Sequence, residues 1–253
     1  MLPHGLANPK LLCRVSSRSG ELPKMYTDDE CQSTLLIPPF KRDWITPPEF
    51  AYYEAIMSFT AATSIRLPPA CETALLERFL KAETMALWTV RSARLQDVPP
   101  NVYVFLRKHE EDEQQHLAQF EAMIGRQPRE RERLPSVPRQ WPALAVQLYG
   151  YESLGLEFAT LLVTLRPDLV SIREDELVHV EFFEQEIRRL LKDGTSAAEQ
   201  ARVSARAWWR KLPRTVDRYL EAAVLDPFRP VLAGRILSSI ERRFTTTGLL
   251  KDG

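Results

Sequence analysis

Apolar side chains recur every three to four residues over four long segments of the chain, which places them along one face of a helix. These segments cover about residues 70–95, 101–124, 142–165 and, after Arg166-Pro167-Asp168, the stretch up to about residue 191. Short turns join the first segment to the second and the third to the fourth. Gly125 stands where a left-handed residue often ends a helix. The pattern predicts two helical hairpins.

Residues 126–141 carry charges and three prolines, which predicts a long crossover connection between the hairpins. Further helices are expected over about residues 48–65, from Ser196 onward with a kink at Pro213, and over about residues 230–244. No alternation of apolar and polar residues is long enough to make a sheet. We therefore predict an all-α protein.

The domain organisation follows from the same pattern. Residues 1–45 show no sustained periodicity and predict a loosely ordered N-terminal extension, within which Met25 is an alternative start of the mature chain. One helical domain is expected over residues 46–253. Its core bundle would span about residues 70–192, and the additional C-terminal helices about residues 196–246.

Composition narrows the setting and the classes of partner. The 34 basic and 34 acidic side chains balance, so nothing indicates binding to nucleic acid or to an anionic membrane. The chain has neither a secretory signal nor a run of about 20 apolar residues that could span a bilayer. The spacing of Cys13, Cys31 and Cys71 fits neither a disulfide framework nor a zinc site. We expect a cytoplasmic protein with reduced thiols.

The candidate chemistry lies in a phrase that occurs twice. Residues 112–116 read Asp-Glu-Gln-Gln-His and residues 175–179 read Asp-Glu-Leu-Val-His. A Glu and a His three positions apart on a helix share one face and can converge on one metal ion. If these were merely solvated charged faces, three of the chain's four histidines would lie there by coincidence. The predicted ligands are Glu113, His116, Glu176 and His179.

Each Glu-His pair needs a carboxylate from the neighbouring helix, because imidazole and one carboxylate leave a divalent ion short of ligands and charge. Glu83 lies on an otherwise apolar stripe at the height of Glu113. In the third helix Glu152 has the more apolar face, whereas Glu157 matches the height of Glu176 slightly better. Glu152 is the preferred ligand and Glu157 the alternative.

His109 shares the helical face of the second predicted helix with Glu113 and His116. It is either a third histidine ligand, a hydrogen-bond donor beside the metal, or a histidine near the turn with no role. The pattern favours none of these over the others.

The order Glu, Glu-x-x-His, Glu, Glu-x-x-His over residues 83–179 resembles the ferritin-like di-iron carboxylate superfamily. The resemblance implies a four-helix bundle that holds two iron ions, and manganese suits the same ligands. It also implies that Asp112 accepts a hydrogen bond from His179, and Asp175 one from His116, which would orient both imidazoles.

By this resemblance the chain is expected to be an oxygenase that uses O2 to hydroxylate, N-oxygenate or desaturate a small organic substrate. Phe79, Trp88, Phe120, Tyr149 and Phe183 would then either line an apolar pocket or pack as ordinary core. No flavin, nicotinamide or iron-sulfur motif occurs, so a separate reductase or ferredoxin is expected to supply electrons.

Two alternatives belong to other classes of protein. A ferroxidase or peroxide scavenger is disfavoured because the chain lacks the cysteine pairs of a rubredoxin-type site and has additional C-terminal helices. A non-catalytic interaction protein would use the basic C-terminal helices to bind a partner. Trp208 and Trp209 cannot both face one core, so one of them is expected at a homodimer surface or on the flank of the bundle.

Overall fold

The computed structural model describes residues 65–125, 136–192 and 194–250. All regular structure within these ranges is helical, without a strand, as the sequence predicts. The extension expected over residues 1–45 and the helix expected over residues 48–65 lie outside them, apart from the last residue of that helix. Among the described helices, none has both the length and the apolar composition of a membrane span.

The described ranges contain seven α-helices, and the four long ones lie close to their predicted limits. They are α2 (Glu72–Ala93), α3 (Pro100–Ile124), α4 (Trp141–Val163), α5 (Val170–Lys192), α6 (Ser196–Trp209), α7 (Leu212–Tyr219) and α8 (Arg229–Thr246). Single turns of 3-10 helix occur at Pro69–Cys71, Pro167–Leu169 and Ala223–Leu225.

Helix ends follow the backbone chemistry of glycine and proline. Gly125 ends α3 with a φ of 71°, and its N–H donates to the carbonyl of Glu121, as predicted. The prediction of a helix kinked at Pro213 is wrong. Instead α6 ends at Trp209, and Pro213 lies in the first turn of α7, where a backbone N–H has no helical partner and its loss costs nothing.

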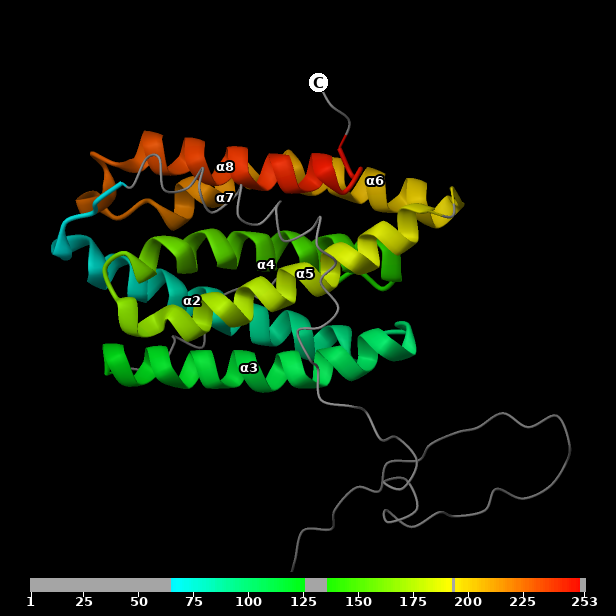
Figure 1. Ribbon diagram of the computed structural model, residues 1–253, viewed down its shortest axis with the longest axis horizontal. Helices are drawn as coiled ribbons and strands as arrows, with labels where there is room; N and C mark the ends of the chain where they lie inside the picture. The colour runs from blue at the N-terminus through cyan, green and yellow to red at the C-terminus, as the bar shows by residue number, and fades with distance from the viewer. Residues whose placement is uncertain (1–64, 126–135, 193, 251–253) are drawn as a thin grey trace, which may run out of the picture. The chain divides into compact units, whose positions relative to one another are not determined.

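The helices pack as two hairpins with a further layer on one side. α2 pairs with α3, α4 pairs with α5, and the hairpins meet mainly through α2 and α4. α6 packs on α4 and α5, and α8 packs on α4 and α7, on the side away from α3 (Figure 1). α4 therefore lies at the centre, and most of its side chains are buried.

Close contact between α4 and α6 depends on a glycine. The indole of Trp208 lies against Gly150, where a Cβ would come within 2.4 Å of the ring. The same indole stacks on Phe244 of α8, with ring centroids 5.1 Å apart. Trp209 is also partly buried against the core. Both tryptophans thus contribute to packing of the C-terminal helices.

Candidate metal centre

The buried stripe of each hairpin helix is apolar at its ends and polar at its middle. In α3 the buried positions follow one another at helical spacing from Val102 to Phe120, with His109, Glu113 and His116 between them. The other three stripes are interrupted in the same way, by Glu83 in α2, Glu152 in α4, and Glu176 and His179 in α5. The apolar packing of the helices thus brings these polar side chains to one level.

The first group of donors combines two histidines and two glutamates: His109, Glu113, Glu152 and His179. His109 Nε2 lies 3.0 Å from Glu113 Oε1 and 3.4 Å from Glu152 Oε2. His179 Nδ1 lies 3.6 Å and 3.4 Å from the same two oxygens. Donors that bind one first-row ion at about 2.0–2.2 Å are separated by comparable distances.

The second group contains one histidine and three glutamates: Glu83, Glu113, His116 and Glu176. His116 Nδ1 lies 3.8 Å from both Glu83 Oε2 and Glu176 Oε1. Within each group one donor atom per residue lies within 4.8 Å of all the others. Glu113 belongs to both groups, so its carboxylate can bridge two ions.

The two histidines of the repeated motif are oriented by carboxylates of the opposite motif. His116 Nε2 lies 3.2 Å from Asp175 Oδ2, and His179 Nε2 lies 3.5 Å from Asp112 Oδ2. Lys108 forms an ion pair with the other oxygen of Asp112. This crosswise pairing, which the resemblance implies, leaves the Nδ1 atoms of both histidines directed into the groups.

Several donor atoms in the two groups have no hydrogen-bond partner among the described residues, although all are buried. They include Nδ1 of His116, Nδ1 of His179, Oε2 of Glu83 and Oε2 of Glu113. Buried polar atoms are rarely left unpaired, because the loss of water then goes uncompensated. A metal ion in each group would satisfy these atoms, so the residues present fit a two-metal site.

The pKa values of the glutamates in the two groups also fit a two-metal site. Burial raises the pKa values of Glu83 and Glu176 well above the ordinary value, and the charge of Glu113 adds to this effect. Burial also opposes ionisation of Glu152, but His109 and His179 outweigh it and lower the pKa of Glu152 to about 2. Four carboxylates share one dry space, and two divalent cations would balance their charge.

Histidine titration reflects the same carboxylates. Burial lowers the pKa of His109, but the charges of Glu152 and Glu113 outweigh it and raise the pKa to about 10. The pKa of His179 is likewise raised to about 9, chiefly by Asp112 and Glu152, although burial and the charge of His109 lower it. Without metal, both imidazoles therefore act as buried counter-cations.

Aromatic rings cover the two-histidine group. Phe105 of α3 stacks on Phe182 of α5 at 3.6 Å between ring centroids, and its ring lies 5.7 Å from His109 and 6.1 Å from His179. The two imidazoles lie 3.9 Å apart. These rings keep water from one side of the centre.

The structure separates the two glutamates of α4 that the sequence left open. Glu152 lies in the first group, whereas Glu157 faces α8 and accepts a hydrogen bond from Ser239 Oγ at 2.5 Å, with Arg243 3.7 Å away. Glu157 thus lies outside both groups. His109, also left open, lies in the first group.

The expectation for the pocket holds for one of five aromatic residues. Phe79 lines a pocket beside the groups, but Trp88 is 41% exposed and the other three are packed in the core: Phe120, Tyr149 and Phe183. Its other aromatic lining residues, Tyr151, Phe158 and Tyr219, were not predicted, and neither were the small residues Ala82, Ala86 and Gly155. Ala82 and Ala86 form a small-residue repeat four positions apart in α2, beside Glu83.

Known proteins do not identify the two donor groups. Comparison of the chain with protein-family models, with curated proteins and with solved structures gives no match. The assignment of a function therefore rests on the residues of the two donor groups.

Proposed function

We propose that this chain is an O2-dependent non-haem di-iron oxygenase with a ferritin-like four-helix core, acting on a small organic substrate. The observation that carries the proposal is the pair of buried donor groups that share Glu113. His109, Glu152 and His179 would complete one metal site, and Glu83, His116 and Glu176 the other. Manganese in one or both sites fits the same donors.

Two ferrous ions held by these residues would supply electrons for the reduction of O2, and a separate reductase or ferredoxin would restore them after each turnover. The chain's own residues orient and insulate the centre. Asp175 and Asp112 hold His116 and His179 with Nδ1 inward, and Phe105 excludes water from the two-histidine side.

The pocket beside the centre favours an organic substrate over the ferroxidase alternative. Apart from Arg78 and the carboxylates of the two donor groups, its lining is made of apolar side chains and two tyrosines. A path for iron ions into a ferroxidase site would require acidic side chains along its length. An apolar lining instead suits a carbon skeleton that has to approach the metals.

Metal stoichiometry with matched variants tests the proposal. Glu152→Gln and Glu157→Gln alter two buried glutamates of the same helix, only one of which lies in a donor group. We expect two irons per chain in the wild type and in Glu157→Gln after anaerobic ferrous loading. We expect less iron in Glu152→Gln, and least in Glu113→Ala, which removes the shared carboxylate.

Exposure of the loaded proteins to O2 then separates the function classes. An oxygenase should consume about one O2 per two ferrous ions and stop until a reductant is added. Continued O2 uptake with excess ferrous iron, and accumulation of ferric mineral, would identify a ferroxidase. Equal metal content in wild type and Glu113→Ala, without a change in thermal stability on adding iron, would leave a helical interaction protein.

A further inference from the structure

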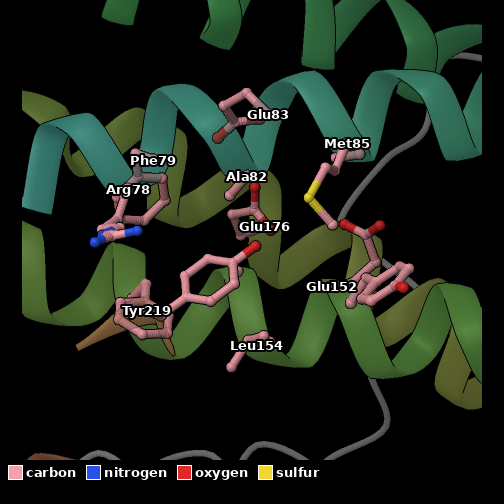
Figure 2. Close-up of a pocket in the computed structure, with 13 residues that line it drawn as sticks. Arg78, Phe79, Ala82, Glu83, Met85, Glu152, Leu154, Glu176 and Tyr219 are labelled. Atoms are coloured by element: carbon pink, nitrogen blue, oxygen red, sulfur yellow. The ribbon is translucent and has the colours of Figure 1, made fainter. Parts of the chain in front are cut away.

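The pocket lies between α2 and α4 and leads to the metal centre (Figure 2). It is open to solvent, and about 550 Å³ of empty space lies within and in front of it, solvent at its mouth included. Phe79, Ala82 and Met85 of α2 line it together with Leu154 and Phe158 of α4. The space between the helices is narrow, because it opens only where the smaller of these side chains leave room. The pocket therefore suits a slim molecule.

Three carboxylates of the metal centre form the inner wall of this pocket. Glu83 and Glu176 belong to the one-histidine group, and Glu152 belongs to the two-histidine group. None of the three histidines lines the pocket. A molecule that enters between α2 and α4 would therefore meet the carboxylate side of both metal sites, while the imidazoles stay behind it.

The pocket contains one cationic side chain among its lining residues, Arg78. Its Nη2 lies 2.7 Å from Glu221 Oε1, and the side chain of Glu221 is 56% exposed. An ion pair with such an exposed partner is weak and exchanges readily. A guanidinium also binds a carboxylate in a planar, two-pronged manner. Another carboxylate can therefore replace that of Glu221.

The distance between this cation and the metal centre sets the shape of the ligand. Arg78 and Glu83 are five residues apart on α2, so their backbone positions are separated by about 7.5 Å along the helix axis. The wall between them includes Phe79 and Ala82 and offers no charge. A ligand that reaches both ends needs an anionic group, then an apolar segment of medium length.

Resting on the proposed function, we propose that the substrate is a slim, mostly apolar carboxylic acid. Its carboxylate binds Arg78 in place of Glu221, and its apolar segment lies between α2 and α4 with the reactive carbon near Glu83 and Glu176. Arg78 is thus a specificity-determining residue, which holds the end of the substrate that does not react.

Octanoate and 1-octanol, which share a chain length and differ in charge, are the probes for calorimetric binding to the full-length protein. We expect octanoate to bind at least tenfold more tightly than 1-octanol. Arg78→Gln should reduce octanoate affinity about tenfold and leave that of 1-octanol unchanged. Glu221→Gln, which removes the competing carboxylate, should tighten octanoate binding. Ala82→Leu, which narrows the pocket, should weaken binding of both probes.

The control is Arg91→Gln, since Arg91 also lies on α2 and also pairs with a glutamate, Glu110, but lies outside the pocket. Equal affinity for the two probes, or octanoate binding that survives Arg78→Gln, would overturn the inference. So would the absence of binding by either probe.

Each titration is made with metal-loaded protein and again after chelation, with metal content measured in parallel. Binding of octanoate that depends on Arg78 in a chain that takes up no metal would refute the di-iron function and leave the pocket inference standing. Two metals per chain without octanoate binding would refute the pocket inference and leave the di-iron function standing. The two proposals can therefore fail separately.

Discussion

Gly155 of α4 provides the sharpest test of the donor geometry. A Cβ at this position would lie 2.5 Å from Oε2 of Glu176 and 3.2 Å from its carboxyl carbon. The carboxylate of Glu176 in α5 thus lies directly over the backbone of α4, and a Cβ there would force it to move. We predict that Gly155→Ala expels Glu176 from its place in the one-histidine group and weakens metal binding there.

The size of the effect follows from the contact. Ordinary van der Waals contact of a Cβ is 3.4–4 Å, so the carboxylate oxygen has to withdraw by about 1 Å. Metal donors tolerate displacements of about 0.2 Å. Disturbing an outer residue that orients a ligand typically costs 10–100-fold in metal affinity, and displacing the ligand itself should cost at least as much. Alanine is the better helix former by about 0.5–1 kcal/mol, so the fold should survive.

The matched control is Gly234→Ala in α8, where a Cβ would meet nothing within 4 Å. Competition with a chelator for ferrous or manganous ions measures affinity, and thermal unfolding of the metal-free proteins measures stability. We expect Gly234→Ala to gain stability and keep two tight sites. Gly155→Ala should keep one tight site and lose the other. Two sites of wild-type affinity in Gly155→Ala would refute the position assigned to Glu176.

Three further predictions concern other parts of the chain. His109→Ala should retain about one metal per chain, since only the two-histidine group loses a donor, and elemental analysis measures this. The metal-free protein should lose stability in denaturant titrations between pH 7 and 10. His109 and His179 have folded-state pKa values of about 10 and 9, above the ordinary 6.5, so the stability they contribute is complete below pH 6.5 and is lost as pH rises through the folded values. Gly150→Ala should cost about 1–3 kcal/mol, because Trp208 has to move, and should leave metal content unchanged.

Each of these predictions has a result that contradicts it. Loss of both metals in His109→Ala would mean that the groups cannot fill separately. A metal-free protein whose stability does not fall from pH 7 to 10 would show that the histidines are neutral when folded. Wild-type unfolding of Gly150→Ala would show that Trp208 does not pack on α4.

The long helices and the two Glu-x-x-His motifs could be predicted because their signals are local. Helical spacing of apolar residues, the turn sequences and Gly125 each depend on neighbours within a few positions of the chain. The motif is local too, since Glu113 and His116 share a face whatever packs against it. These are the features in which sequence and structure agree most closely.

The sequence preferred Glu152 over Glu157 for its more apolar face, but signals of this local kind could not settle the choice. α4 is enclosed by α2, α5, α6 and α8, so both glutamates are buried and apolar neighbours do not distinguish them. Which face of α4 meets α5 and which meets α8 is decided by the placement of the C-terminal helices. For the same reason the position of His109 beside His179 depends on contact between α3 and α5, which the sequence of α3 alone cannot reveal.

Most of the pocket's lining could not be predicted, because small side chains contribute to it beside the aromatic ones. Large aromatic residues near a site normally fill the core, as Phe120 and Phe183 do, whereas alanines and glycine leave room between helices. Ala82 and Gly155 line the same pocket only because α2 and α4 pack together. A void is therefore a property of two surfaces, and small residues on one helix do not by themselves predict it.

The two sides of the metal centre are lined by different side chains, aromatic rings on one and carboxylates on the other. This difference bears on both its stability and its proposed function. On one side Phe105 and Phe182 cover the histidines, so that the imidazoles are dry and fixed. On the other, carboxylates such as Glu83 border the pocket, and carboxylates can change their mode of binding more easily than imidazoles. Buried glutamates also destabilise the metal-free chain unless they take up protons, so metal binding should both release protons and stabilise the fold. The side that the proposed substrate would reach is therefore the adaptable one, and bound metal ions would offset the cost of burying its carboxylates.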